Sequence, residues 1–152
     1  MKAKLKQDLT LQTIVINNTP YHVTPLLDYT DYFGSTCGHI ISRVSGEPRV
    51  LRGMDCRGYL KVRLRQTSAL KAVNKSVHRL VVSAFYEEPD TDYSGGRRSQ
   101  VNHIDGDKTN NKVANLEQVS PTENIQHLNQ VLKAIDVLQA EANKAKVLQH
   151  AK

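Results

Sequence analysis

The sequence predicts an α+β fold, in which a small antiparallel β module precedes a hairpin-plus-helix module and a C-terminal helical segment. Three observations support this prediction. Polar and aliphatic residues alternate along Tyr59 to Leu64, the pattern of a strand with one buried face. Apolar residues recur at spacings of three and four from Val77 to Tyr86, the pattern of a helix packed on a core. Beyond Gln100, two short strand-like runs precede a sharply capped helix.

The predicted β module consists of short strands separated by glycine and proline. Residues 11–16 are expected to form one strand, which Pro20 ends. A hairpin is expected over Tyr32 to Gly46, because two apolar or β-branched runs flank a glycine there. A second hairpin is expected to join residues 49–51 to residues 59–64 through the turn GMDCRG. Together these elements predict an antiparallel sheet of about three or four strands.

The first predicted helix covers about Val77 to Tyr86. Ser76 can cap its start, and Pro89 closes the segment. The run PDTDYSGGRRSQ that follows is expected to be a loop. We expect His78, near the start of this helix, to be a structural packing residue.

The second predicted helix starts at the run SPTE. Ser120 stands at the cap, Pro121 at the first helical position, and Glu123 can complete a capping box. An apolar stripe continues along one helix, or two helices with a bend, and we expect it to face the core. Its members are Leu128, Val131, Leu132, Ile135, Leu138, Ala142, Ala145 and Leu148.

Length and composition limit the class of protein. The chain has 152 residues and 39% hydrophobic content, which suits one ordinary domain or two very small modules with a modest core. No run approaches the 18 or so apolar residues of a membrane-spanning helix. Cys37 and Cys56 form no CxxC pair, so neither a disulfide framework nor a zinc ribbon is indicated. We therefore expect a soluble, cytoplasmic, monomeric protein.

Positive charge is concentrated in the middle of the chain. The net charge is +6, and between Arg43 and Arg79 ten Lys or Arg residues stand against two acids. The strand pattern places several of these cations on one face above buried aliphatic side chains, which favours phosphate binding over a merely solvated surface. We expect these residues to contact the phosphates of a polyanion: Arg43, Arg52, Arg57, Lys61, Arg63, Arg65, Lys75 and Arg79.

The stretch VNHIDGDKTNNKVANLEQVSPTEN, residues 101–124, has an unusual polar composition. A calcium loop of the EF-hand type would explain Asp105 and Asp107, but Asn110 stands where glycine is required and Leu116 where a bidentate glutamate is required. A solvated hairpin loop explains Gly106 and the asparagines. It does not explain the Asn102-His103 pair just before the loop, nor an amide one turn into the capped helix.

The order strand, loop, strand, helix favours a metal-dependent site. If the hairpin packs on the first helical turn, side chains of the first strand converge with Asn124, and one oxygen ligand from each, with the other positions open, suits a hard divalent cation that takes phosphate oxygens. His103 stands beside that spot, and a neutral imidazole is a suitable general base for a water that attacks phosphorus.

Two segments resemble a known family. VHRLVVSAF, residues 77–85, and VNHIDGDKTNNKVANLEQVSPTENI, residues 101–125, are similar to the HNH nuclease module of phage and intron-borne homing endonucleases, whose fold is the ββα-metal hairpin-plus-helix. The upstream YFGSTCGHIISR and GYLKVRL resemble the small β module that precedes it in those proteins. The resemblance covers about 95 residues, from Tyr32 to Ile125.

The resemblance implies a role for four residues. His103 is the general base that activates water, and Asn102 and Asn124 fall on the metal-ligand positions. Asn115 matches the central asparagine, which braces the loop and orients the base through hydrogen bonds. The implied cofactor is one divalent cation, Mg²⁺ or Mn²⁺, and the implied partner is double-stranded DNA.

The chain departs from this family in two places. Many relatives have aspartate where this chain has Asn102, and a neutral amide attracts a divalent cation less than a carboxylate does. Many homing relatives also carry a C-terminal helix-turn-helix, for which about 28 residues after Asn124 leave no room. DNA readout is then expected to rest mainly on the β module.

The sequence thus predicts a nicking, metal-dependent HNH DNA endonuclease of the homing type, in the cytoplasm of a bacterial host if a phage encodes it. The predicted parts are a DNA-binding β module at residues 1–75, the nuclease module at 76–125 and a helical segment at 126–152. The alternative of another class is a DNA-binding protein, such as a regulator, that keeps the nuclease fold without catalysis. A partner-binding protein that uses the C-terminal stripe is a third hypothesis.

Overall fold

The computed structural model describes residues 4–65, 71–87 and 100–150, and at several positions of the last helix, Asn124 among them, the backbone alone. The predicted α+β fold is confirmed. One antiparallel sheet has the order β1-β2-β3-β4-β5, formed by β1 Gln12–Ile16, β2 Thr19–Pro25, β3 Tyr32–Ser35, β4 Ile40–Ser42 and β5 Arg49–Val50. A second sheet has the order β6-β7-β8, formed by β6 Met54–Cys56, β7 Tyr59–Arg65 and β8 Ala72–Ser76.

The remaining elements follow in chain order. Helix α1 covers Val77–Phe85, and the two-stranded sheet of β9 Gln100–His103 and β10 Leu116–Val119 comes next. The 3-10 helix η1 Val113–Asn115 lies just before β10, and α2 covers Pro121–His150. The loop predicted before β9 lies, except for Gln100, outside the described residues.

The first hairpin corrects the role predicted for Pro20. Asn17 and Asn18 both have positive φ, 49° and 62°, as a two-residue type I′ turn requires. The chain therefore reverses before the proline, and Pro20 lies in β2 opposite Val15. β3 pairs only with Val23 to Pro25 of β2. Within the described residues the edge at Pro20 therefore has no partner strand on that side, and it tolerates the missing N–H.

The predicted second hairpin is also wrong in its first strand. β5 pairs with β4, and Leu51 N–H donates to the Ile40 carbonyl at 2.8 Å, so this segment belongs to the first sheet. The partner of β7 is β6, with Cys56 opposite Tyr59. β8, which the sequence did not predict, pairs with the other edge of β7. The described residues before α1 thus form eight strands, more than the sequence predicted.

The alternation predicted for β7 and the helix predicted after it are both confirmed. Val62 and Leu64 are buried at 1% and 0% exposure, whereas Arg63 and Arg65 are exposed. α1 begins one residue after Ser76, but the Ser76 side chain makes no capping hydrogen bond, so its predicted capping role is wrong. The helix is stabilised instead by packing, because seven of its nine residues are buried.

One hydrophobic cluster joins the sheets to α1 and to the β9–β10 hairpin. α1 approaches β3 so closely that a Cβ at Gly34 would lie 3.1 Å from the Ala84 Cβ. The cluster contains Leu64 of β7, Phe85 of α1 and Leu116 of β10. A smaller cluster, of Ile14, Val23 and Ile41, forms separately. The predicted division into three parts stays a prediction, although the larger cluster contains side chains from both sides of residue 75.

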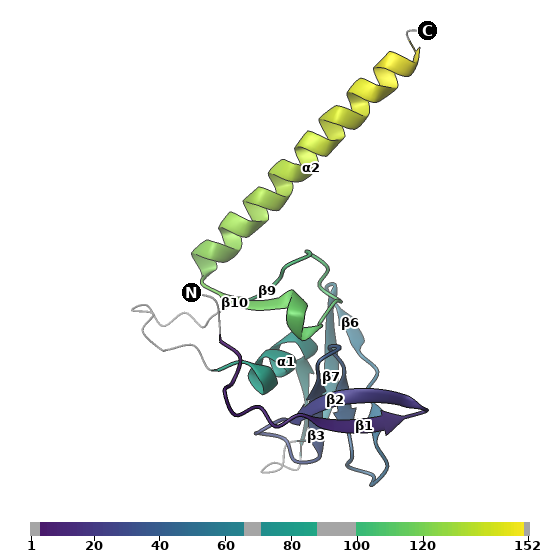
Figure 1. Cartoon of the computed structure of the whole chain (residues 1–152), viewed down its shortest axis with the longest axis vertical. Coiled ribbons are helices and arrows are strands. Elements are labelled where there is room, and N and C mark those ends of the chain that lie inside the picture. Colours follow the sequence, from purple (N-terminus) through teal and green to yellow (C-terminus); the bar gives the residue numbers. More distant parts are fainter. Residues whose placement is uncertain (1–3, 66–70, 88–99, 151–152) are drawn as a thin grey trace.

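Helix α2 begins at the hairpin and then extends away from the rest of the molecule (Figure 1). The prediction that its apolar stripe faces the core is wrong for the members whose side chains the structure describes, because Leu128, Leu132 and Leu138 are 55%, 50% and 64% exposed. α1 already covers β3 and β7, and among the described elements α2 has its main contacts with the small hairpin. Neither helix in the described part of the chain has the length and apolarity needed to cross a membrane.

Candidate active site

The β9–β10 hairpin carries Asn102 and His103 just before its polar loop. Asn102 is paired with Glu117, and His103 is paired with Leu116. Successive side chains of a strand point to opposite faces, so Asn102 and Glu117 share one face while His103 and Leu116 share the other. Asn102 is 9% exposed and His103 is 5% exposed. These neighbours in sequence therefore meet different surroundings.

Asn115 fixes the loop between the two strands. Its Nδ2 donates to Asp105 Oδ1 and to the Asn110 carbonyl, each at 2.8 Å, and its Oδ1 accepts the Asp105 backbone N–H at 3.1 Å. Hydrogen bonds from Asn110 and Asn115 hold the pKa of Asp105 below its usual value. Asp107 accepts hydrogen bonds from Thr109. The loop contacts expected of Asn115 are present, and both carboxylates take part in turns.

The imidazole of His103 is oriented by Asn111, a residue that the sequence analysis missed. Asn111 Oδ1 lies 3.1 Å from His103 Nε2. The other branch of the amide, Nδ2, donates to the Thr109 carbonyl at 3.1 Å, so the oxygen is the branch that faces the ring. An amide oxygen only accepts, which requires Nε2 to hold the ring proton and leaves Nδ1 with the lone pair. Asn115 thus holds the loop, whereas the His103 ring is held by Asn111.

The β3–β4 turn packs directly against the backbone of Asn111. Gly38 has a φ of +86°, and a Cβ there would lie 2.3 Å from the backbone carbonyl carbon of Asn111. The Val113 N–H donates to the Thr36 carbonyl at 3.1 Å, which joins the same turn to η1. The β module therefore contacts the segment that orients His103.

A cluster of three rings, Tyr59, His78 and His103, lies between β7, α1 and β9. The ring centroids are 5.1 Å apart for Tyr59 and His78, 5.4 Å for His78 and His103, and 6.1 Å for Tyr59 and His103. Burial, together with the charges of His103 and Arg79, lowers the pKa of His78 to about 4. Its Nδ1 has no hydrogen-bond partner among the described residues. His78 is therefore a neutral packing residue at pH 7, as the sequence analysis expected.

The Asn102 amide donates from Nδ2 to Glu117 Oε1 at 2.8 Å across the hairpin. Asn124 lies in the first turn of α2, which contacts both β9 and β10, but its side chain is outside the described atoms. The predicted capping box is confirmed. Ser120 N–H donates to Glu123 Oε2 at 2.8 Å, and Glu123 N–H donates to Ser120 Oγ at 3.2 Å. Hydrogen bonds, the largest contribution coming from the Ser120 N–H, lower the pKa of Glu123 to about 2.

These residues fit a hard divalent cation by their chemistry. An amide and a carboxylate lie side by side at Asn102 and Glu117, and oxygen donors are what Mg²⁺ and Mn²⁺ prefer. In the described part of the chain no group of three or more His, Cys, Asp or Glu side chains is placed to hold a metal ion. A site here would therefore depend on amide oxygens as well as carboxylates.

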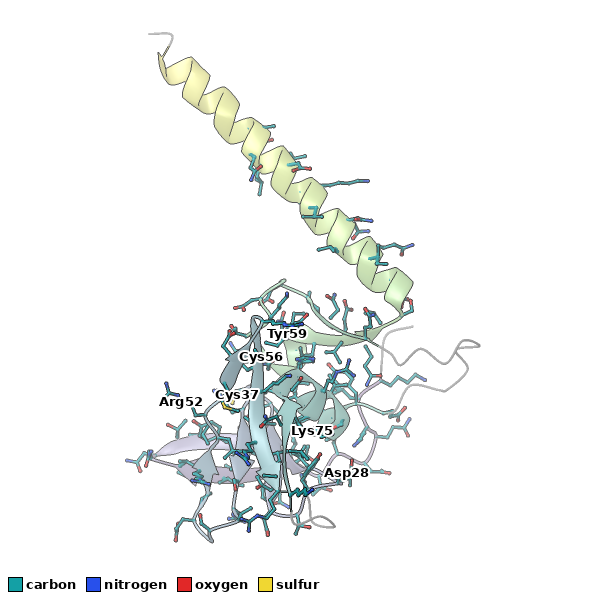
Figure 2. All side chains as sticks on the ribbon, turned by 180° about the vertical axis from the view of Figure 1, so that it is seen from behind. Asp28, Cys37, Arg52, Cys56, Tyr59 and Lys75 are labelled. Atoms are coloured by element: carbon teal, nitrogen blue, oxygen red, sulfur yellow. The ribbon has the colours of Figure 1, made fainter. Side chains whose placement is uncertain are left out.

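The predicted DNA contacts fall into separate groups. Lys61, Arg63 and Arg65 share one face of β7 with Tyr59. Tyr59 lies at the end of β7 that is nearest to the β9–β10 hairpin (Figure 2). Lys75 is opposite Val62 and so lies on the other side of that sheet. The remaining four are exposed at other places: Arg43 against the Phe33 ring, Arg52 between β5 and β6, Arg57 in the β6–β7 turn and Arg79 on α1.

The β6–β7 turn connects this basic face to the candidate site. Lys108, from the polar loop, places its Nζ 4.8 Å from the centre of the Tyr59 ring. A Cβ at Gly58 would lie 3.5 Å from the Lys108 Cδ. The row of cations on β7 therefore begins at the residue whose ring contacts His103.

Comparison with known proteins identifies this arrangement. Residues 75–126 match the family model described as HNH endonuclease. Residues 75–126 are thus an HNH endonuclease module. The fold of the chain is similar to that of the HNH homing endonuclease I-HmuI, solved in a study of DNA binding and cleavage, with a TM-score of 0.56 and 27% identity over 74% of this chain and 59% of that one.

Two curated HNH relatives extend the likeness. The uncharacterized HNH endonuclease L247 of Acanthamoeba polyphaga mimivirus is 32% identical over 68% of this chain and 24% of its own length. YosQ of Bacillus subtilis (strain 168), named as an SPbeta prophage-derived homing endonuclease of the HNH type, is 49% identical over 36% of this chain and 28% of its own length. The chain thus spans about a quarter of these curated relatives.

Proposed function

We propose that the chain is a DNA endonuclease that hydrolyses phosphodiester bonds with His103 as general base and a divalent cation as cofactor. One observation supports this function above others. The buried imidazole of His103 is held by Asn111 with Nδ1 as its basic atom, and it contacts Tyr59, where the row of cations on β7 begins. The HNH endonuclease module and the likeness to a homing endonuclease support the same activity.

His103 takes a proton from water at Nδ1 while Nε2 keeps its hydrogen bond to Asn111. The water oxygen forms a bond to phosphorus, and the bond from phosphorus to the 3′ oxygen breaks. The departing oxygen gains a proton from solvent, so the products carry a 5′-phosphate and a 3′-hydroxyl. The neighbouring His78 stays neutral, which avoids a like charge beside the imidazolium that forms.

Asn102 and Asn124 would hold the cation, on β9 and on the first turn of α2. When bound, Mg²⁺ or Mn²⁺ supplies positive charge to the scissile phosphate and to the leaving oxygen. The contacts between α2 and both strands keep these two positions on one small unit. The capping box fixes the residue at which α2 begins, so it also fixes the position of Asn124 within the first helical turn.

Double-stranded DNA is the proposed substrate. Lys61, Arg63 and Arg65 would contact successive phosphates, and Arg57 would reach the backbone from the β6–β7 turn. One site of this kind cuts one strand, so nicking by a monomer is the proposed outcome. A homing role and the cytoplasm of a bacterial host remain parts of the same proposal.

Supercoiled plasmid provides the test of activity. Wild-type protein with Mn²⁺ is expected to convert supercoiled plasmid to nicked circles whose ends a DNA ligase can rejoin, and EDTA is expected to abolish this conversion. Ends that ligase cannot join would contradict the proposed bond cleavage, because the enzyme requires a 5′-phosphate and a 3′-hydroxyl. Undiminished nicking in EDTA would contradict the proposed metal dependence.

A second candidate function is DNA binding without cleavage, and the neutral amide at Asn102 favours it. This function predicts that wild-type protein and Asn102→Asp both bind plasmid, with an affinity that falls steeply as salt rises, yet neither nicks it. Nicking by either protein would exclude it. A gain of nicking in Asn102→Asp alone would show a complete but weakened catalytic site.

A further inference from the structure

The proposed metal site pairs a neutral amide with a carboxylate on the facing strand. Glu117 is directly opposite Asn102, and the two side chains share one face of the hairpin. The Asn102 Nδ2 lies 2.8 Å from Glu117 Oε1, and Asn102 is 9% exposed. A buried amide is therefore held by a charged acceptor.

The Glu117 carboxylate determines which end of the amide it binds. A carboxylate has no proton to donate, so it can bond only the NH₂ end of Asn102. The amide oxygen then lies on the other branch, turned from Glu117, and is the atom that would meet a cation. Hydrogen bonds from N–H groups to ionised acceptors are about twice as strong as neutral ones, so this orientation is firmly held.

Glu117 also brings charge that Asn102 lacks. A single negative charge one side chain away from a cation attracts it strongly where the surroundings are partly buried. The effect of this charge is already visible at Tyr86, where burial and then Glu117 raise the pKa of the phenol. Metal sites commonly depend on such outer groups to orient and polarise the direct ligands.

We propose that Glu117 is a positioning residue of the metal site, which turns the Asn102 amide oxygen toward the cation and supplies the negative charge absent from position 102. This inference rests on the proposed function and assigns a role to a residue outside the predicted ligand set. It also predicts electrostatic repulsion in Asn102→Asp, since two carboxylates would then face each other across the hairpin.

Binding of Mn²⁺ alone to the full chain provides the test, with the free Mn²⁺ signal followed by electron paramagnetic resonance. Glu117→Gln keeps an acceptor for the Asn102 amide but removes the charge, and we expect its affinity to fall about 10-fold or more. Glu117→Ala removes both and is expected to bind at least as weakly. Asn102→Asp/Glu117→Gln moves the carboxylate across the hairpin and is expected to restore wild-type affinity.

Asp136→Asn is the matched control, because it removes one carboxylate from an exposed position of α2. It is expected to bind Mn²⁺ as the wild type does. Circular dichroism melting of each variant separates loss of binding from loss of fold, and the double variant must recover affinity whatever the stability of Glu117→Ala.

Two results would overturn the inference while leaving the proposed function intact. One is wild-type Mn²⁺ affinity in Glu117→Gln together with plasmid nicking by the wild type. The other is weak binding by the folded double variant, which would show that the carboxylate cannot be moved. Absence of both Mn²⁺ binding and nicking in the wild type would overturn the proposed function and this inference together.

Discussion

At the scale of single residues, Asn102 and His103 are neighbours in β9 whose side chains meet different surroundings. The alternation of β9 sends Asn102 toward Glu117 and His103 toward the ring cluster of Tyr59 and His78. His103 and its neighbours in the motif could be predicted from the sequence. The identity of Asn111 as the partner of His103 could not be predicted, because the loop contains several asparagines and only their backbone positions decide which amide reaches the ring.

The position of Glu117 could have been predicted from the sequence. Pairing the two predicted strand runs in antiparallel register puts it opposite Asn102. The loop carboxylates Asp105 and Asp107 lie nearer to His103 in the sequence, but both are used in turns. Counting residue pairs outward from the loop identifies Glu117 as the carboxylate opposite Asn102.

Gly38 provides a residue-scale prediction about the segment that holds the His103 ring. Gly38→Ala is expected to shift Asn111, lower the melting temperature and reduce nicking, because the added Cβ has no room beside the Asn111 backbone. Gly46→Ala is the matched control, since Gly46 has a similar φ of +89° but nothing within 4 Å. It is expected to cost only about 1 to 2 kcal/mol of stability. Equal losses in the two variants would contradict the close contact.

His78 provides a prediction about pH. Its folded pKa of about 4 lies below the ordinary value of 6.5, so the unfolded chain takes up the proton first as pH falls. The stability that neutral His78 contributes is complete above pH 6.5 and is lost toward pH 4. Between pH 7.5 and 5 this loss amounts to about 2 kcal/mol.

Urea unfolding at several pH values measures the effect of His78. The titratable and charged groups around it are Tyr59 on β7, His103 on β9 and Arg79 on its own helix. His78→Phe keeps a ring in the cluster and is expected to lose less stability than the wild type over this range. The exposed control His22→Phe should keep the wild-type pH dependence, and an unchanged slope in His78→Phe would show that His78 does not titrate as described.

At the scale of elements, sequence patterns predicted those strands and helix ends that interactions between near neighbours in the chain determine. The alternation of β7, the helical spacing of α1 and the capping box of α2 were all predicted and are all present. Strand partners were not predictable in the same way. β5 and β6 both precede β7 closely, and only tertiary packing assigns β5 to the first sheet and β6 to the second.

The exposed face of β7 carries the element-scale prediction. Arg63→Gln is expected to weaken DNA binding. The slope of log affinity against log salt is negative, and its magnitude is expected to fall by about 0.9, the value for one lost phosphate contact. Arg49→Gln, at an exposed position of the first sheet, is expected to leave the slope unchanged. Filter binding at several salt concentrations measures both, and equal slopes for the two variants would remove β7 from the proposed DNA interface.

At the scale of the whole molecule, one core links the β module to the site. Leu116 is 1% exposed and shares its cluster with Val62 and Leu64 of the second sheet. Composition and patterning could indicate a modest core but could not show that the two predicted modules share it. The long α2 was similarly unpredictable in its surroundings, because a helical stripe does not reveal whether anything lies against it.

The shared core predicts common unfolding. Leu116→Ala is expected to cost about 2 to 5 kcal/mol and to speed amide hydrogen exchange at Val62 and Leu64 by the matching factor. Leu27→Ala, at a side chain that is 86% exposed, is expected to change stability by less than about 0.5 kcal/mol. Unchanged exchange in β7 of Leu116→Ala would mean that the two parts unfold separately.

The central claim is that His103 is the base of a nuclease site, and single-turnover nicking of supercoiled plasmid in Mn²⁺ tests it most directly. Wild type, His103→Ala and the exposed control His22→Ala are compared at equal bound protein, with folding checked by circular dichroism. His22→Ala is expected to nick at the wild-type rate, and His103→Ala about 10² to 10⁴ times more slowly. Nicking by His103→Ala at the wild-type rate would contradict the assignment of the base.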